Sequence, residues 1–401
     1  MHPGADDEVV APTHTDPAAR AWSERFGGPV GSHGRPHSWW TPVRVVLAVA
    51  TIVCCLGIVQ KVPCIQAGWA DNDARYGKMC YSDIPYLYTA RGFAEQTWPY
   101  SASRYDTMEY PVGISYFAYA ASLLTVPFAT GPPAAVRAAT PTAGLFGLPG
   151  MQREVNRNFL VNAVLLMLVA LAAAYFLVGA HRRRPWDALM FAASPLLLVD
   201  SLINWDLLAV ACVCGAFWAW ARGKPVLTGV LIGLGTATKL YPLFLLGAMF
   251  VVCLRRREIG VFATATAAAV VAWLVLDLPV MLTGFTEWKH FWTFNADRGP
   301  DLGSLWLFAA QVGHTATPHT INVASWLVFG IVCLLVLVLG MTAPKPPRMA
   351  QLAFLIVAAF LLVNKVYSPQ YALWLLPLAV LARPRWRDQV IWQACELFYF
   401  G

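Results

Sequence analysis

The sequence predicts an all-α polytopic membrane protein with about ten or eleven transmembrane helices. Two observations carry this prediction. The 401 residues are 58% hydrophobic and only 13% charged, which is too apolar for a soluble domain to bury in its own interior. Apolar runs also recur along the chain with short basic clusters between them, and this pattern orients helices in a bilayer.

The chain begins with residues 1–42, which are rich in Gly, Pro, His and charge and show no apolar period. We expect a disordered cytoplasmic tail there, followed by one transmembrane domain over residues 43–401. A last helix, beginning near 389, is cut off at Gly401, so we expect the native chain to be longer. The apolar runs predict helices near 44–60, 158–180, 186–202, 205–221, 225–239, 241–254, 260–281, 321–342, 349–363, 369–382 and 389–401.

The basic clusters predict the orientation of these helices. The positive-inside rule makes the clusters cytoplasmic, and we expect a multi-pass plasma-membrane protein with a cytoplasmic N-terminus. If the run 110–130 crossed the membrane, the next basic cluster, Arg182–Arg184, would lie on the external side. The run is therefore predicted to be a re-entrant or surface-lying hairpin within a first external loop, 61–157. A second external loop covers 283–318. The clusters are Arg182–Arg184, Arg222 with Lys224, Arg255–Arg257, Lys345 with Arg348, and Arg383 with Arg385 and Arg387.

Cysteine and charge usage exclude some kinds of site. Cys64 and Cys80 both fall in the first external loop, where an oxidising exterior could join them, whereas the other cysteines lie in apolar stretches. No CxxC or HExxH spacing occurs, so we expect no metal site. The net charge of +7 sits in short clusters beside apolar runs, which gives no support for nucleic-acid binding.

Four polar clusters interrupt the apolar sequence, and the parity of the runs places all four on the external side. They are Asp83, Asn204–Asp206, Lys239–Pro242 and Asn364–Tyr371. Ionisable groups near the apolar zone are costly unless they line a wet cavity or find partners. Their gathering on one side therefore indicates a functional site.

Asp83 and three cations are the candidates for chemistry. Rings on both sides of Asp83 would desolvate it and raise its proton affinity, which suits a general base; it could instead cap a helix beginning at Pro85. Lys239 precedes Tyr241 and Pro242 at one predicted helix break, Lys365 follows Asn364 at another, and Arg298 lies in an external loop. Together they could bind a phosphate. The alternatives are snorkelling lysines, and an Arg298 paired with Asp297 or Asp301.

These motifs also carry a resemblance. The chain resembles the GT-C fold membrane glycosyltransferases, specifically the actinobacterial polyprenol-phosphate-mannose-dependent mannosyltransferases of glycosyltransferase family 87. It is also similar to the catalytic subunit of eukaryotic GPI mannosyltransferase I. The matching segments run in family order over about 44–385: Asp83–Tyr86, Pro99–Tyr100, Glu109–Pro111, Lys239–Pro242, Arg298 and Asn364–Trp374.

The resemblance implies a GT-C-like transmembrane catalytic domain that transfers a sugar, with mannose expected, from a polyprenyl-phosphate donor at the extracytoplasmic face. Asp83 would activate the hydroxyl of a glycolipid or cell-envelope glycan acceptor. Lys239, Lys365 and Arg298 would hold the donor phosphate, and a single displacement would invert the sugar. Eukaryotic relatives carry a second Asp two residues later, where this chain has Pro85, so we expect metal-independent transfer without a cofactor.

Further polar and aromatic residues are candidates for binding the substrates. They are Tyr86, Tyr88, Glu109, Tyr110, Asn204, Asp206, Tyr241, Asn364, Gln370 and Tyr371. Two alternatives remain open. Broken helices with buried charges also mark transporters and lipid-linked sugar flippases, although these usually show internal repeats, which are not evident here. An inactive membrane scaffold would fit if the polar groups were unconnected in space.

Overall fold

The computed structural model describes residue 17, residues 39–181 and residues 183–400. Within these residues every regular element is helical, and the predicted all-α polytopic membrane fold is confirmed. The predicted tail, residues 1–42, lies almost entirely outside the described part of the chain.

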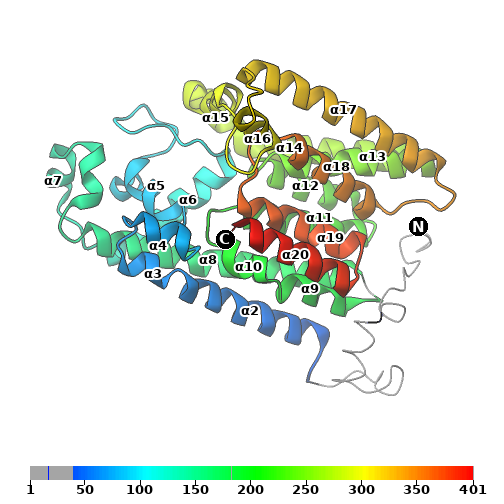
Figure 1. Ribbon diagram of the computed structural model, residues 1–401, viewed down its shortest axis with the longest axis horizontal. Helices are drawn as coiled ribbons and strands as arrows, with labels where there is room; N and C mark the ends of the chain where they lie inside the picture. Colours follow the sequence, from blue (N-terminus) through cyan, green and yellow to red (C-terminus); the bar gives the residue numbers. More distant parts are fainter. Residues whose placement is uncertain (1–16, 18–38, 182, 401) are drawn as a thin grey trace.

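Most helices agree with the predicted runs, but the predicted helix 186–202 is divided into three short helices, because Pro185 and Pro195 each begin a new one. Further helices, most of them short, lie in the loops (Figure 1). In chain order they are α2 (Pro42–Gln60), α3 (Val62–Gln66), α4 (Asn72–Gly77), α5 (Ile84–Ala90), η1 (Phe93–Glu95), α6 (Val112–Thr125), η2 (Val126–Phe128), α7 (Ala134–Ala139), η3 (Thr142–Gly147), α8 (Met151–Ala180), η4 (Pro185–Ala188), α9 (Leu189–Ala192), α10 (Pro195–Asp200), α11 (Leu207–Trp220), α12 (Pro225–Thr236), η5 (Tyr241–Phe244), α13 (Leu245–Arg256), α14 (Ile259–Thr283), α15 (Phe285–Asp297), α16 (Leu305–Gln311), α17 (Pro318–Thr342), α18 (Met349–Val363), η6 (Pro369–Tyr371), α19 (Ala372–Ala382) and α20 (Trp386–Phe400).

Four helical stretches of the described chain are long and apolar enough to cross a membrane unaided: Pro42–Gln66, α8, α14 and α17. The other apolar helices are shorter because polar residues and prolines interrupt their runs. The break between α12 and α13 contains Lys239 and Pro242, where the sequence predicts a broken pair. Irregular backbone at such a depth requires a cavity or protein partners for its polar groups.

Small residues bring α12 and α14 into close contact. A Cβ atom added at Gly229 would lie 2.0 Å from the carbonyl oxygen of Ala265, and one added at Gly233 would lie 2.2 Å from that of Ala269. Glycines four residues apart allow two helix backbones to approach in this way. The contact fixes α14 against the broken helix pair that carries Lys239.

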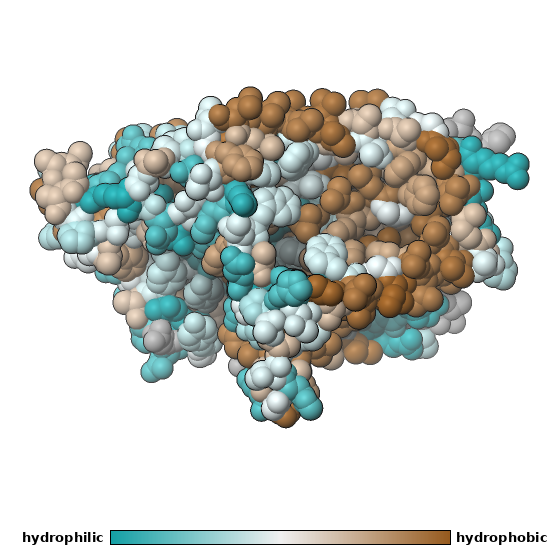
Figure 2. Space-filling view, turned by 90° about the horizontal axis from the view of Figure 1, so that it is seen from above, coloured by the Kyte–Doolittle hydropathy of each residue, from teal (hydrophilic) through white to brown (hydrophobic). Residues whose placement is uncertain are grey.

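The basic clusters meet at one end of the helical bundle. Their arginines donate hydrogen bonds to backbone carbonyls beside neighbouring clusters, in the pairs Arg222–Gly179, Arg255–Ala343, Arg348–Ala382 and Arg184–Pro384. Figure 1 shows the loop helices α3 to α7 gathered at the opposite end. Figure 2 shows one face, on which hydrophobic residues dominate one half and hydrophilic residues are mixed with residues of intermediate hydropathy over the other half. The bundle therefore has a basic end and a loop end.

The segment 110–130, predicted as a hairpin, is a single helix, α6, continued by η2, and it packs on α8. The chain then returns to α8 through α7 and η3. A buried ion pair fastens this return, since Arg137 Nη2 lies 2.8 Å from Glu154 Oε2. Glu154 also accepts hydrogen bonds from the backbone of Thr130 and Gly131 and from the Tyr88 hydroxyl.

We expect Glu154→Gln to destabilise the protein strongly. The Glu154 side chain is 1% exposed and that of Arg137 is 9% exposed, so the substitution leaves a buried guanidinium without its counter-charge. The expected cost is about 3–5 kcal/mol. Intrinsic-fluorescence melting in detergent measures the effect as a lowered melting temperature. Asp106→Asn is the control, because the Asp106 side chain is 91% exposed, and equal losses in both variants would contradict the prediction.

Candidate active site

A cavity of about 580 Å³, which we call the main cavity, lies where the loop region meets the helix breaks. It gathers residues from all four polar clusters predicted by the sequence and from the external loop 283–318. The predicted site residues that line it are Asp83, Glu109, Tyr110, Asn204, Lys239, Arg298, Asn364, Lys365, Gln370 and Tyr371. The scaffold interpretation required these groups to be unconnected in space, and the main cavity connects them.

Asp83 stands at the N-cap position of α5, but its side chain makes no capping hydrogen bond. The capping interpretation of this side chain is therefore wrong. The carboxylate instead accepts hydrogen bonds from two phenols, with Tyr81 Oη 2.5 Å from Oδ1 and Tyr110 Oη 2.7 Å from Oδ2. Burial raises the pKa of Asp83, while the two phenols act in the opposite direction by stabilising its charge.

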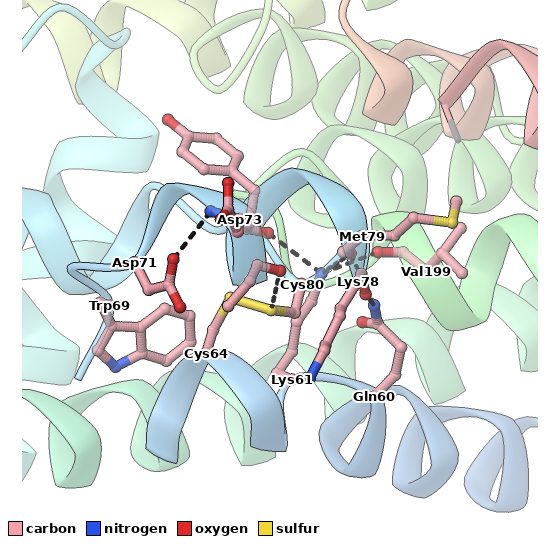
Figure 3. The surroundings of a disulfide bond; sticks show 12 residues. Gln60, Lys61, Cys64, Trp69, Asp71, Asp73, Lys78, Met79, Cys80 and Val199 are labelled. Atoms are coloured by element: carbon pink, nitrogen blue, oxygen red, sulfur yellow. Dashed lines mark hydrogen bonds between the residues drawn. A yellow bond between two sulfur atoms is a disulfide. The ribbon is translucent and has the colours of Figure 1, made fainter. Parts of the chain in front are cut away.

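A buried clamp holds the segment that leads into Asp83 (Figure 3). Lys61, which is 0% exposed, donates hydrogen bonds through Nζ to the carbonyl oxygens of Tyr81 and Val199, each at 3.1 Å. A disulfide joins Cys64 and Cys80, the pair that the sequence singled out. The clamp ties Tyr81, the first partner of Asp83, to the end of α2. Sequence reasoning missed Lys61 because it resembles an ordinary lysine at a helix end.

The opposite part of the main cavity is cationic. Lys365 is 8% exposed, and its Nζ donates to Asn322 Oδ1 at 2.8 Å and to the Ala296 carbonyl at 3.1 Å. Lys365 forms no ion pair among the described residues. Burial is the main cause that lowers the pKa of Lys365, and the positive charge of the nearby Arg298 lowers it further.

Arg298 pairs with Asp301, as one of the two sequence interpretations predicts. Lys365 and Arg298 line this part of the main cavity with one carboxylate, Asp301, while the charge of Asp297 acts on Lys365 from outside the lining. The two cations in the wall suit an anion.

Lys239 has a different environment. Its Nζ lies 2.9 Å from Asp206 Oδ1, and Asp206 Oδ2 also accepts a hydrogen bond from Trp374 Nε1 at 2.9 Å. The ammonium group stands 4.6 Å from the centre of the Tyr110 ring, whose hydroxyl binds Asp83. The charge of Lys239 is thus matched by Asp206, and its position links the Asp206 turn to the phenol beside Asp83.

Asn204 and Glu109 are each held by a neighbouring side chain, Asn204 by a hydrogen bond and Glu109 by an ion pair. The Asn204 amide donates to the Tyr110 hydroxyl at 3.3 Å, which extends the hydrogen-bond chain to Asp83. Glu109 pairs with Arg91 at 2.9 Å, so its charge is matched at the edge of the main cavity. Tyr110 consequently has polar contacts on both sides, and its orientation is fixed.

Four predicted substrate-binding residues do not line the main cavity. Tyr86 donates a hydrogen bond to the Trp69 carbonyl, and Tyr88 donates to Glu154, so both belong to the packing of the loop region. Asp206 lies behind Lys239, and Tyr241 is stacked on Trp374 with ring centres 4.5 Å apart. These last two support residues of the cavity wall.

The structure adds residues that the sequence prediction omitted. The most informative is Asn322, which holds Lys365 and lines the main cavity. Its signal was a lone amide near the start of the apolar run 321–342. Trp292 and Phe294 of α15 also line the cavity and offer ring faces to a sugar or a prenyl chain. Among the described residues no group of three His, Cys, Asp or Glu side chains could hold a metal ion, and metal-independent transfer remains a prediction.

Comparison with known proteins assigns the chain to a family. The model of glycosyltransferase family 87 matches residues 120–364, more than half of the chain, whereas no curated protein matches it. The matched region contains Lys239, Arg298 and Asn364 of the main cavity, and Asp83 precedes it. A helical membrane fold with this match fits the GT-C type. The chain therefore belongs to glycosyltransferase family 87 and is a membrane glycosyltransferase.

Proposed function

We propose that this glycosyltransferase transfers a sugar, with mannose the first candidate, from a polyprenyl-phosphate donor to a hydroxyl of a lipid or cell-envelope glycan acceptor. The observation that carries the proposal is that Asp83, bound by neutral phenols, and the cations Lys365 and Arg298 line the same cavity. A base for an acceptor hydroxyl and a site for a departing phosphate are the two charges that this reaction needs.

In the proposed mechanism Asp83 takes the proton of the acceptor hydroxyl as its oxygen attacks the anomeric carbon of the donor sugar. The new bond forms from this oxygen to the carbon while the bond from the carbon to the phosphate oxygen breaks. The leaving polyprenyl phosphate keeps the electron pair of that bond. Lys365 and Arg298 stabilise the charge that develops on it, and a single displacement inverts the anomeric configuration.

In this proposal Lys239 acts on the base, Asp83, and does not bind the donor phosphate. Its charge is matched by Asp206, and it faces the ring of Tyr110, so it adds positive potential beside the Asp83–Tyr110 hydrogen bond. No step requires a metal ion, and none is proposed. The basic end of the bundle supports the membrane orientation, because the positive-inside rule would place it in the cytoplasm and the loop region outside.

Asp83→Asn should abolish sugar transfer while leaving donor binding intact. Asparagine keeps the size and one acceptor oxygen but cannot take the acceptor proton, so turnover should fall by about 10²–10⁴-fold. Purified protein incubated with radiolabelled polyprenyl-phosphate mannose and membrane extract provides the assay, read as a new labelled glycolipid. Asp106→Asn removes an exposed carboxylate from the same loop and should behave as wild type. Wild-type turnover in Asp83→Asn would reject Asp83 as the base, and donor movement without a new glycolipid in the wild type would favour a flippase.

Tyr110→Phe should move the acid limb of the pH–rate profile to higher pH. The base works only when it is deprotonated, so activity falls as the pH drops through the pKa of Asp83, which burial already raises. The Tyr110 hydroxyl stabilises the charged form at 2.7 Å, and its removal raises that pKa further. Transfer rates measured from pH 4 to pH 8 test this. A shift to lower pH, or an unchanged limb with reduced amplitude, would show that Tyr110 acts only in packing.

Lys365→Met should weaken donor binding by roughly ten- to a hundredfold, since a hydrogen bond to a charged group contributes about 1.5–3 kcal/mol. The KM for the donor and competition by polyprenyl phosphate measure this loss. Lys289→Met is the matched control, because it removes an exposed lysine of α15 that does not line the main cavity. An unaltered donor KM in Lys365→Met would remove Lys365 from the phosphate site.

A further inference from the structure

Tyr371 brings a free phenol hydroxyl to the wall of the main cavity. The hydroxyl forms no hydrogen bond with any described residue, and it is not among the unpartnered polar atoms that the protein encloses. A molecule in the main cavity can therefore reach it. The ring is firmly packed, with its centre 4.1 Å from that of Trp374 and 6.4 Å from that of Tyr367. The side chain is thus held by its ring while its polar atom remains available.

The position of this phenol relates it to both reactive parts of the main cavity. The charges of Asp83, Arg298 and Lys239 all act on it. The Lys239 ammonium lies 4.6 Å from the centre of the Tyr110 ring, beside the base, and 6.0 Å from the centre of the Tyr371 ring. The hydroxyl is therefore near the proposed base and near a cation of the proposed phosphate site.

Gln370, the preceding residue, offers a second free polar atom. Its side chain lines the main cavity, and the residue is 5% exposed. Its Oε1 accepts a hydrogen bond from the Ser368 hydroxyl at 2.6 Å, which fixes the orientation of the amide. Its Nε2 has no partner in the described part of the chain and is not enclosed by the protein. Because a buried donor without a partner is costly, this amide nitrogen indicates a contact with a polar ligand.

The chemistry of a single displacement indicates what the Tyr371 hydroxyl binds. The base and the leaving phosphate act on opposite sides of the anomeric carbon, so a group near both lies beside that carbon. The ring neighbours of the anomeric carbon are the ring oxygen and carbon 2. The ring oxygen acquires positive charge in an oxocarbenium-like transition state, and a phenol O–H directed at it would oppose this charge. The hydroxyl on carbon 2 becomes a stronger hydrogen-bond donor at the same moment, and a phenol oxygen can accept from it.

We propose that Tyr371 is a catalytic residue whose hydroxyl accepts a hydrogen bond from the 2-hydroxyl of the donor sugar, and that Gln370 donates to another hydroxyl of the same sugar. This inference rests on the proposed function, which identifies the ligand as a polyprenyl-phosphate sugar. The phenol contact strengthens as the sugar becomes cationic, so it contributes more to turnover than to donor binding. Donor selection by the protein therefore depends on a free hydroxyl at carbon 2.

A cycle of changes in the protein and in the donor tests the contact with carbon 2. The donors are the polyprenyl phosphates of mannose, 2-deoxymannose and 6-deoxymannose. Tyr371→Phe should lower kcat about ten- to a hundredfold with the mannose and 6-deoxymannose donors, with the donor KM within about threefold of wild type. With the 2-deoxymannose donor the same substitution should change kcat less than about twofold. Tyr175→Phe is the matched control, because this tyrosine of α8 is 48% exposed and does not line the main cavity.

Equilibrium binding tests the sugar contacts without relying on turnover. The probes, measured by calorimetry on the detergent-solubilised protein, are citronellyl-phosphate mannose, its 2-deoxy analogue, and citronellyl phosphate, which lacks the sugar. Gln370→Met should weaken binding of the mannose probe about five- to tenfold and leave that of citronellyl phosphate unchanged, whereas Lys365→Met should weaken both. The wild type should prefer the mannose probe over its 2-deoxy analogue about threefold, and Tyr371→Phe should abolish this preference.

The outcomes separate this inference from the proposed function. Equal losses of kcat in Tyr371→Phe with the mannose and 2-deoxymannose donors would overturn the contact with carbon 2. A loss that disappears with the 6-deoxymannose donor would also overturn it, since the phenol would then bind a different hydroxyl. Unchanged binding of the mannose probe by Gln370→Met would remove Gln370 from the sugar site. A protein that transfers no sugar but shows the Tyr371-dependent preference would support the sugar site and refute the proposed reaction, and absence of that preference would overturn both.

Discussion

The site depends on keeping opposite charges apart inside one cavity. Asp83 is bound by the hydroxyls of Tyr81 and Tyr110, and Lys365 is bound by an amide and a carbonyl, so each charge is stabilised by neutral dipoles. A direct ion pair between them would satisfy both groups and leave neither a base for a hydroxyl nor a cation for a phosphate. Neutral hydrogen-bond partners stabilise a buried charge without neutralising it, so the charge can still interact with a substrate.

That separation requires rigid supports, and the fold supplies them from distant parts of the chain. The disulfide and Lys61 tie Tyr81 to the end of α2, and the ion pair of Lys239 with Asp206 fixes the turn behind Tyr110. Lys61 is hydrogen-bonded to backbone carbonyls, and Lys239, which also lines the main cavity, is matched by Asp206, whereas Asp83 and Lys365 have only neutral partners among the described residues.

Sequence reasoning identified the residues whose side chains break an apolar pattern and missed those whose role depends on packing. Asp83, Arg298 and Lys365 stand out because an ionisable group beside an apolar run is costly, and the main cavity brings them together. Tyr86 and Tyr88 share the aromatic segment of Asp83 but turn into the loop packing, a direction that local sequence does not encode. Lys61 and Asn322 were missed for the converse reason: each is a single polar residue at or within a run that reads as an ordinary membrane helix.

The interrupted helices explain how cavities form beside the long helices of the bundle. A continuous span satisfies its backbone internally and offers only side chains, whereas the break between α12 and α13 places Lys239 in the wall of the main cavity and Leu240 in the walls of both the main cavity and an adjoining cavity of about 250 Å³. Close packing of Gly229 and Gly233 against α14 stabilises this broken pair. A larger residue at Gly233 would have to separate α12 from α14, and the geometry of both cavities would change together.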